Sequence, residues 1–509
     1  MRAFSAETRT ACLTRMAENT FDVLVVGGGI TGAGIALDAA SRGLSVALVE
    51  KADFASGTSG RSSRLIHGGL RYLEHGEIGL VHECLRERSI LLRLAPHLVR
   101  PVPMYLLAPS AHERALYGVG LTGYDLLAAG RNIGVHHRVT AQQVRDAVPD
   151  FGGRSGGYRY FECQTDDARL TVEVARTAHA FDAVLANHAE VTGLLGDGRV
   201  TGAAVTDALT GESLDVRARV TVNATGVWAD EVAGLAGGRT GSGGPRLRPS
   251  KGVHLVFAPA AIQATAAFVV PSAAQDGRSV FLVPWEDRVY AGTTDTPYDG
   301  DLDNPPVEPA DQQYILAAVA QYFPAVTERD VVASWAGLRP LLAGAHARET
   351  APSEDLSRRH AVFAGPPGLL TISGGKLTTY RAMAEALVDR IAARFRPSGG
   401  CRTRSIPLGL HGSAAQARIL ARAEAAGLSL PPSVADRLVQ RYGDDWREAV
   451  AMIGAEPSLA EPVVDGLPAL KVEVELARGR EMAITDEDVF VRRTRLTTLD
   501  ASVRLPTTG

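Results

Sequence analysis

The sequence predicts an α/β fold with a buried parallel sheet, a region of shorter strands and a C-terminal helical region. A run of β-branched and apolar residues from Phe21 to Val26 ends in glycines, as expected of a strand buried on both faces of a parallel sheet. Shorter strand patterns separated by turns fill residues 250–300, and short amphipathic helical patterns follow residue 400. The length of 509 residues corresponds to about three domains.

The elements can be assigned in order along the chain. A helical pattern from Ile30 to Arg42 ends at Gly43, which suits a left-handed helix end, and a second apolar run ends at Glu50, completing a βαβ unit. Residues 1–20 are expected to form a ragged leader with some helical character, and residues 100–155 show only a weak pattern. Further helices are expected at 78–95, 170–180, 379–395, 413–426, 433–442, 444–453 and 485–497, and further strands at 190–195, 202–207, 217–223 and 369–374.

The composition excludes several classes of protein. Basic residues number 53 and acidic residues 57, and the resulting net charge of −4 argues against a nucleic-acid-binding protein. The four cysteines lie far apart without a CxxC pair, which predicts no metal site and no disulfides and fits a reducing cytoplasm. The N-terminus lacks the apolar core of a signal peptide. The most apolar stretch, Ala115–Gly130, is short and contains Asp125, so any membrane contact is expected to be peripheral.

Three glycines after the first strand form a dinucleotide-binding motif. Gly27, Gly29 and Gly32 have the G-x-G-x-x-G spacing, in which a tight turn brings backbone N–H groups close to a pyrophosphate at the start of a helix. Glu50 ends the second strand, where a carboxylate can bind ribose hydroxyls. Lys51 either contacts the cofactor or is an exposed residue at the strand end.

The choice between the dinucleotides NAD and FAD depends on segments much later in the chain. A strand at 220–226 closes with Thr225 and Gly226, and a second glycine-rich junction between a strand and a helix lies at 373–381. Segments that return to one cofactor from across about 350 residues suit the long, extended FAD better than a compact NAD domain. We therefore expect FAD.

The sequence resembles the FAD-dependent glycerol-3-phosphate dehydrogenases, within the broader group of D-amino-acid-oxidase-like flavoproteins. The most specific matches are IHGGLRYLE in residues 66–74 and GGKLTTYR in residues 374–381. The resemblance extends over about residues 20–500, and the matching segments lie at 27–88, 165–170, 223–230, 251–257, 281–301, 335–342, 373–385 and 481–496. One departure is Arg64, which stands where the family often has lysine.

The resemblance implies a Rossmann-like FAD-binding domain, an antiparallel-sheet cap domain for the substrate and a small C-terminal helical domain. The FAD-binding domain would comprise residues 20–95, 155–240 and 352–396, the cap domain residues 96–154 and 241–351, and the helical domain residues 400–509. The cofactor contacts that it implies, together with those of the glycine motif, are Gly27, Gly29, Gly32, Glu50, Lys51, Thr58, Ser59, Ser63, His67, Gly68, Gly69, Gly226, Gly375, Lys376 and Thr378. The alternative for residues 58–63 is a solvated loop.

A phosphorylated polyol is the substrate that the resemblance implies, and its dianion needs fixed cations. Arg71 and Arg339 lie in matched motifs, and Arg358 lies in a segment that follows the family only roughly; arginine binds phosphate through two parallel donors. Tyr72 either contacts the substrate or flavin or is an ordinary packed tyrosine. Asp295 is expected to bind a substrate hydroxyl or to orient the catalytic histidine.

The implied reaction is oxidation of sn-glycerol 3-phosphate at C2 to dihydroxyacetone phosphate, with hydride transfer to flavin N5. His254 is the candidate that accepts the hydroxyl proton, because a neutral imidazole accepts protons near pH 7. Its other interpretation is a histidine that only orients the substrate or packs within its strand. Lys376 is expected to stabilise negative charge on the flavin or on the substrate oxygen.

The electron acceptor that the resemblance implies is a membrane quinone, reached from the cytoplasm by peripheral contact with the inner face of the cell membrane. One alternative is an oxidase that transfers the electrons to oxygen, and another is a D-amino-acid-type oxidase. A third is a flavin-binding protein without turnover. Only four of the 53 basic residues are lysines, which coding bias explains, yet Lys251 and Lys376 both lie in matched motifs.

Overall fold

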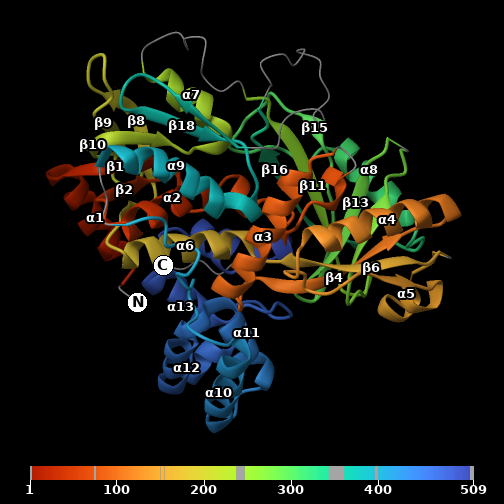
Figure 1. Cartoon of the computed structure of the whole chain (residues 1–509). Helices are drawn as coiled ribbons and strands as arrows, with labels where there is room; N and C mark the ends of the chain where they lie inside the picture. Colours follow the sequence, from red (N-terminus) through yellow and green to blue (C-terminus); the bar gives the residue numbers. More distant parts are fainter. Residues whose placement is uncertain are drawn as a thin grey trace.

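The structure is a computed structural model that describes residues 3–73, 76–149, 151–153, 155–236, 247–274, 276–342, 360–395 and 399–504. Two sheets lie side by side, and a group of C-terminal helices lies below them in the view of Figure 1. The predicted α/β fold with a second sheet and a helical C-terminal region is confirmed.

The first sheet is built around β1 (Thr20–Val26), which pairs in parallel with β2 (Val46–Val49) and β10 (Ser213–Asn223). Its other strands are β7 (Val184–Ala186), β8 (Ala189–Leu195), β9 (Gly202–Asp207), β17 (Ala361–Ala364) and β18 (Leu369–Ser373). β7 and β18 continue the parallel part in the order β18–β10–β1–β2–β7, while β17, β8 and β9 pair antiparallel. The strands expected near 21–26, 190–195, 202–207, 217–223 and 369–374 and the one ending at Glu50 are confirmed, whereas β7 and β17 were not predicted.

Helices cover both faces of the first sheet. On one face, α2 (Ile30–Ser41) packs between α6 (Asp167–Ala180) and α9 (Tyr380–Phe395), and these helices share a core with Val23 and Val25. On the other face, α1 (Ala6–Glu18) packs on β7 and β10. The expected ragged leader is therefore a regular helix, whose buried Arg9 binds Asp207 at 2.7 Å.

The second sheet takes its strands from the middle of the chain and from segments nearer the N-terminus. Its order is β15–β11–β14–β13–β12–β4–β6–β3, with β16 beside β11 and β5 beside β6, and only β4 and β12 pair in parallel. The strands are β3 (Leu65–Ile66), β4 (Arg100–Leu107), β5 (His137–Val139), β6 (Gly157–Gln164), β11 (Ser250–Phe257), β12 (Ala267–Pro271), β13 (Ser279–Trp285), β14 (Arg288–Gly292), β15 (Thr296–Pro297) and β16 (Val331–Arg339). The helices α4 (Ala111–Leu127), α5 (Ala141–Ala147) and α8 (Pro309–Ala320) pack against this sheet, whereas α3 (Ile78–Leu94) contributes its last turns to the core of the first sheet.

Strand β6 belongs to the second sheet, although it lies in the segment 155–240 that is expected to be part of the FAD-binding domain. It pairs with β4 along its whole length and also with β3 and β5. The weak pattern of residues 100–155 concealed these partner strands. β3 also lies in the second sheet, which places residues 65–66 outside the first sheet. The expected boundaries at 240 and 351 fall outside the described residues.

The C-terminal region contains α10 (Ala414–Gly427), α11 (Pro432–Tyr442), α12 (Trp446–Ala455) and α13 (Lys471–Arg480). The helices expected at 413–426, 433–442 and 444–453 are confirmed, whereas the single helix expected at 485–497 is wrong. In its place are the π-helical turn η9 (Asp488–Arg493) and the short helix α14 (Leu496–Leu499), separated by Arg495 in a left-handed conformation with a φ of 64°. The side chain of Arg495, at the break, binds Asp166 and the carbonyl oxygen of Gly60, which are contacts far from this segment in the chain.

Two kinds of feature do not occur in the part of the chain that the structure describes. None of its helices has both the length and the apolar composition that crossing a bilayer requires. Its histidine, cysteine and acidic side chains form no group of three that could hold a metal ion.

Candidate active site

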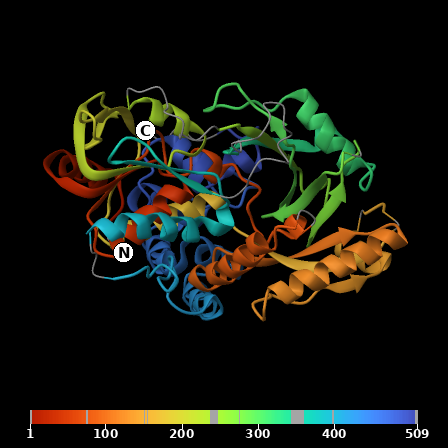
Figure 2. The same ribbon diagram turned by 45° about the horizontal axis from the view of Figure 1, so that its top comes forward.

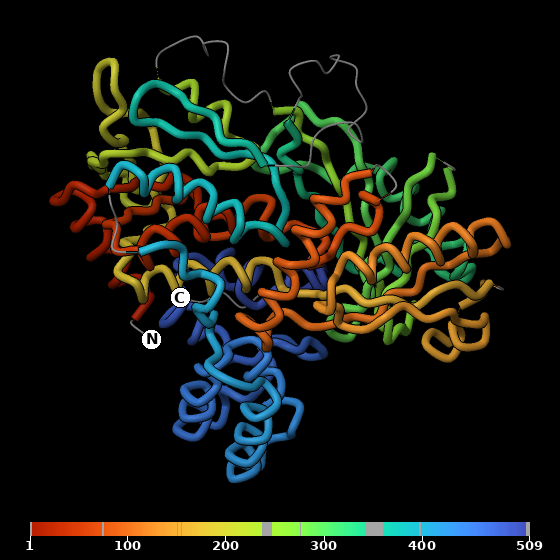
Figure 3. Tube along the Cα trace, in the orientation of Figure 1, coloured from red at the N-terminus to blue at the C-terminus, as the bar shows by residue number. Residues whose placement is uncertain are grey.

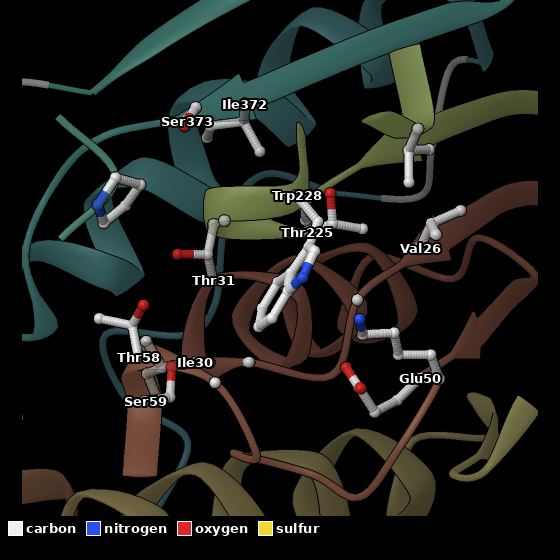
Figure 4. A pocket seen from close by; sticks show the side chains of 18 of the residues that line it. Val26, Ile30, Thr31, Glu50, Thr58, Ser59, Thr225, Trp228, Ile372 and Ser373 are labelled. Atoms are coloured by element: carbon white, nitrogen blue, oxygen red, sulfur yellow. Dashed lines mark hydrogen bonds between the residues drawn. The ribbon is translucent and has the colours of Figure 1, made fainter. Parts of the chain in front are cut away.

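A cavity of about 310 Å³ lies at the carboxyl ends of the parallel strands of the first sheet. Val26 at the end of β1, Val49 at the end of β2 and Ile372 in β18 all line it. Ligands of open α/β sheets bind at this edge. Figure 4 shows the side chain of Trp228 between Glu50 on one side and Thr58 and Ser59 on the other.

The motif glycines bring the first turn of α2 against β1. Gly27 has a φ of +110°, and a Cβ on Gly32 would lie 1.9 Å from the carbonyl oxygen of Gly27. A side chain at position 32 would therefore push the helix away from the strand, and with it the N–H groups that face the cavity. Ser59 supports this turn, because its Oγ accepts a hydrogen bond from the backbone N–H of Ile30 at 2.9 Å.

Glu50 and Lys51 lie together at one end of the cavity. The Glu50 carboxylate accepts hydrogen bonds from the backbone N–H of Gly28 (2.6 Å) and Ala52 (3.0 Å). Burial raises the pKa of Glu50, and these two hydrogen bonds oppose the rise. The Nζ of Lys51 lies 2.5 Å from Asp303 and 4.3 Å from the ring centroid of Trp228. Lys51 is thus a partly exposed, ion-paired side chain that also faces the cavity.

Lys376 lies at the other end of the cavity, after the glycines that follow β18. Gly375 has a φ of +90°, which favours glycine, and Lys376 comes directly after it. The Nζ of Lys376 lies 3.7 Å from the ring centroid of Tyr72 and 3.9 Å from the Sγ of Cys84. Among the described residues it has no carboxylate partner, so its charge remains available to an anion in the cavity.

The segment from His67 to Gly69 joins this end of the cavity to the second sheet. The hydroxyl of Thr378 exchanges hydrogen bonds with the backbone of His67 at 3.2 and 3.3 Å, and the N–H of Gly68 donates to Glu162 at 3.0 Å. Gly69 has a φ of +80°, and a Cβ there would overlap the Tyr72 ring. These contacts hold the short helix η2 (Leu70–Leu73), which carries Arg71 and Tyr72.

Arg339 ends β16 and is one-quarter exposed. One guanidinium nitrogen lies 3.3 Å from the carboxylate of Asp295, and the other donates to the hydroxyl of Thr293 (3.0 Å) and the carbonyl of Thr294 (3.1 Å). Asp295 also accepts a hydrogen bond from Ser250. Because Pro340 lines the cavity, Arg339 is adjacent to its wall.

His254 is buried in β11 and does not line the cavity. Its Nε2 lies 2.8 Å from the hydroxyl of Ser63, and its ring stacks on Trp335 with the centroids 4.7 Å apart. Burial lowers the pKa of His254 well below its usual value, and the charges of Arg339 and Arg64 lower it further. The imidazole is therefore neutral near pH 7, as expected of a proton acceptor, but neither His254 nor its partner Ser63 lines the cavity.

A buried arginine that the sequence marked only as a departure from the family lies beside this histidine. Arg64 is 1% exposed, has a φ of 55°, and its guanidinium lies 4.3 Å from the ring centroid of Trp285 and 4.5 Å from that of Trp335. Trp335 therefore stacks between Arg64 and His254. Burial lowers the pKa of Arg64. Sequence reasoning missed this stack because its members come from three separate segments.

The segment between residues 51 and 64, which lines the cavity, is held by side chains from the C-terminal region. Asp53 is fully buried and accepts hydrogen bonds from Arg492 (2.8 Å), Arg493 (2.6 and 2.9 Å) and Asn187 (2.9 Å). Figure 3 shows the last part of the chain, in blue, returning to the region between the two sheets. The C-terminal region thus fixes the loop that follows Glu50.

A second set of ion pairs holds residues 60–62 of the same segment. Arg495 binds Asp166 at 3.0 Å and also Asp167, and it donates to the carbonyl oxygen of Gly60 at 2.9 Å. Asp167 in turn accepts a hydrogen bond from the backbone N–H of Ser62 at 2.9 Å. Burial alone would raise the pKa of Asp166, but the surrounding arginine charges hold it well below its ordinary value.

The structure brings most of the expected cofactor residues to one cavity. Its lining includes Gly27, Gly29, Glu50, Lys51, Thr58, Ser59, Gly226, Gly375 and Lys376. The hydroxyl of Thr58 donates to the carbonyl of Leu338 at 2.7 Å, and Ser63 contacts His254. Arg71 is exposed on η2. Arg358 lies outside the described residues.

Two family profiles together match most of the chain. The family described as FAD dependent oxidoreductase matches residues 22–381, and the C-terminal domain of alpha-glycerophosphate oxidase matches residues 401–506. The chain is 40% identical to glycerol-3-phosphate dehydrogenase 2 of Mycobacterium tuberculosis over 502 residues, which cover 97% of this chain and 84% of that relative. It is 38% identical to the aerobic glycerol-3-phosphate dehydrogenase of Bacillus subtilis over 515 residues, 96% and 90% of the two chains.

The chain belongs to the FAD-dependent glycerol-3-phosphate dehydrogenase family. Among solved structures, the glycerol-3-phosphate dehydrogenase of Bacillus halodurans, complexed with FAD, matches with a TM-score of 0.79 and 34% identity, over 98% of this chain and 90% of that one. Glycine oxidase from Geobacillus kaustophilus shares the fold, with a TM-score of 0.57 and 21% identity over 77% of this chain and all of that one.

The cofactor is FAD, and the cavity fits it. The glycine turn and the N-terminus of α2 would hold the pyrophosphate, and Glu50, at the end of β2, would bind the ribose hydroxyls. The cavity continues from there to Gly375 and Lys376, as an extended dinucleotide requires.

Replacing Gly32 with alanine is expected to abolish FAD retention, because the new Cβ would collide with the carbonyl of Gly27. Gly79→Ala in α3 is the matched control, since a Cβ there meets nothing within 4 Å. Flavin absorbance per protein after desalting is the measurement. A Gly32→Ala protein with as much flavin as the wild type would show that FAD binding does not depend on the close contact between Gly27 and Gly32.

Asp53→Asn is expected to destabilise the protein by about 3 kcal/mol and to weaken FAD binding, because two buried arginines lose the carboxylate that they share and keep only their other acidic neighbours. Asp436→Asn, which removes the partner of the exposed Arg422, should destabilise the protein much less. Urea unfolding with and without added FAD measures both effects. Equal losses in the two variants would show that the buried pairs do not hold the loop.

Proposed function

We propose that the protein oxidises sn-glycerol 3-phosphate at C2 to dihydroxyacetone phosphate and transfers the electrons to a membrane quinone. The observation that carries the proposal is Lys376, a cation at the end of the FAD cavity that has no carboxylate partner among the described residues. The names of the relatives that are 38–40% identical support the same substrate.

The substrate phosphate is proposed to bind the arginines near this end of the cavity. Arg339 offers a guanidinium already held in place by Thr293 and Asp295, which lowers the entropy lost when it binds a phosphate. Arg71, on η2 beside Tyr72, is the second candidate, and Arg358 is the third by resemblance. Asp295 has Ser250 and Arg339 as partners, so we assign it the role of orienting Arg339.

The chemistry at C2 requires removal of a hydride and a proton. Bound FAD supplies the two-electron acceptor for the hydride. Lys376 is proposed to stabilise negative charge that develops on the substrate oxygen, since an ammonium fixed near this atom lowers the barrier. Tyr72 lies under this ammonium at 3.7 Å and holds it at the cavity.

We propose His254 as the final acceptor of the hydroxyl proton, reached through the hydroxyl of Ser63. The hydrogen bond of 2.8 Å between Ser63 and Nε2 supports this path, and burial keeps the imidazole neutral. A second imidazole in this region is that of His67, which is half-buried and packs near Tyr72 with the ring centroids 6.3 Å apart.

Transfer of electrons to a quinone requires peripheral contact with the inner face of the cell membrane. An oxidase that uses oxygen keeps the same substrate site, and comparing anaerobic turnover with a quinone analogue against oxygen consumption separates the two activities. A D-amino-acid-type oxidase would instead be saturated by glycine or D-alanine.

Anaerobic glycerol 3-phosphate is expected to bleach the flavin absorbance of the purified protein. Arg339→Ala should lower kcat/KM about a hundredfold or more, because two charge-assisted hydrogen bonds to the phosphate are lost. Lys471→Ala, which removes an exposed lysine paired with Glu461, should behave as the wild type. An unbleached flavin would favour a protein without turnover, and bleaching by D-alanine alone would favour an amino-acid oxidase.

His254→Gln is expected to retain FAD and to slow flavin reduction by about 10²-fold or more. Because its lowered pKa leaves the imidazole neutral, the wild-type reduction rate at saturating substrate should not fall through His254 protonation between pH 8 and pH 6.5. His411→Gln, at an exposed histidine paired with Asp444, is the control. Normal reduction in His254→Gln together with loss in His67→Gln would move the proton acceptor to His67.

A further inference from the structure

Helix α4 presents an apolar face to solvent. Leu116 is 54% exposed, Val119 74% and Leu126 75%, and Ala115 is exposed beside them. At helical spacing these four residues lie on one side of α4. Large side chains so exposed in one row are uncommon on a protein that meets only water, and such patches mark sites of interaction.

The charged residues of α4 are all used elsewhere. Glu113 binds Ser110 in the cap of the helix, and Arg114 donates to the carbonyls of Ala108 and Pro109. Asp125 lies 2.7 Å from His136 and also accepts hydrogen bonds from Asn132 and the backbone of His136. The row of Ala115, Leu116, Val119 and Leu126 therefore contains no acidic or basic side chain.

The inner side of the helix is also apolar and is fully occupied. Leu121 and Tyr124 are buried, and α4 packs on η2, α3 and β6. A helix whose packing is complete on its inner side does not need the outer apolar row for its own stability. The apolar side chains of the outer row are thus free to contact lipid or another apolar surface. The helix itself has 17 residues, which is too short to span a bilayer.

Cationic side chains follow the apolar row. Arg131 and Arg138 are exposed after the end of α4, and the nearby acid Asp125 is paired with His136. Apolar residues on one face with basic residues at the edge are the features of a helix that lies in the headgroup region of an anionic bilayer. In Figures 1 and 2, α4 (orange) lies at the outer edge of the molecule, where a flat surface can reach it.

We propose that the outer face of α4, formed by Ala115, Leu116, Val119 and Leu126, docks on an anionic lipid surface. This face would make the membrane contact that electron transfer to a quinone requires, and the inference rests on the proposed function for that reason. Because α4 packs on η2, which carries Arg71 and Tyr72, docking through α4 places the substrate end of the site near the bilayer.

The test is flotation of the full-length protein with vesicles of phosphatidylglycerol and phosphatidylcholine. The wild type should float with these vesicles and much less with phosphatidylcholine alone. The double variant Val119→Asp/Leu126→Asp should bind at least about tenfold more weakly, since two apolar side chains lose their burial in lipid. The matched control is Ile419→Asp on α10, where an isoleucine is 67% exposed, and it should bind as the wild type.

Turnover with a soluble dye acceptor separates failure of docking from failure of the proposed function. Both variants should keep wild-type dye activity, while activity with a quinone in the vesicles should fall only in the double variant. Wild-type flotation of the double variant would overturn the proposal. So would a dimer in solution that this variant converts to a monomer, because the row would then contact a second copy. Absence of dye activity in every protein would contradict the proposed function but leave the flotation result valid.

Discussion

Buried carboxylates that need partners determine where the segment from residue 51 to residue 64 lies, and the FAD cavity depends on that segment. Asp53, Asp166 and Asp167 are almost without solvent contact. Burying each of these carboxylates would destabilise the fold unless arginines neutralised its charge. The arginines come from residues 492–495, more than 400 residues after Asp53. The C-terminal region is therefore part of the cofactor site even though none of its side chains lines the cavity.

The same segment connects the two sheets at the site. It begins at Glu50 on the first sheet, passes Thr58, which bonds to the carbonyl of Leu338 in β16, and reaches β3 of the second sheet. The cation at the cavity end, Lys376, comes from the first sheet, whereas Arg339 and His254 come from the second. The ion pairs of Asp53, Asp166 and Asp167 hold the segment between residues 51 and 64 in place. Because this segment contacts both sheets, the same ion pairs help to fix the positions of Lys376, Arg339 and His254 relative to one another.

Local patterns were enough to predict the parts of the fold that depend on neighbouring residues. The βαβ unit, the glycine turn and seven of the eight expected helices follow from patterns over short windows, and the structure confirms them, whereas α4, α5, α8 and α13 were not predicted. The place of β6 was missed because a strand's sheet depends on its partners, and its partner β4 lies about 50 residues earlier. The π-helical turn at Asp488 and the stack of Arg64, Trp335 and His254 also escaped prediction. Both depend on contacts between segments far apart in the chain, which no local spacing encodes.

The distribution of arginine and lysine gains a physical meaning from these contacts. The buried arginines that pair with Asp53 and Asp166 use several nitrogens of one planar group, a geometry that a lysine cannot reproduce. Three of the four lysines, Lys51, Lys251 and Lys471, form ion pairs with carboxylates. Lys376 differs, because its described neighbours are an aromatic ring and a thiol. A compact ammonium whose charge no described carboxylate cancels is suited to a transient negative charge, which is the role that the proposed function gives to Lys376.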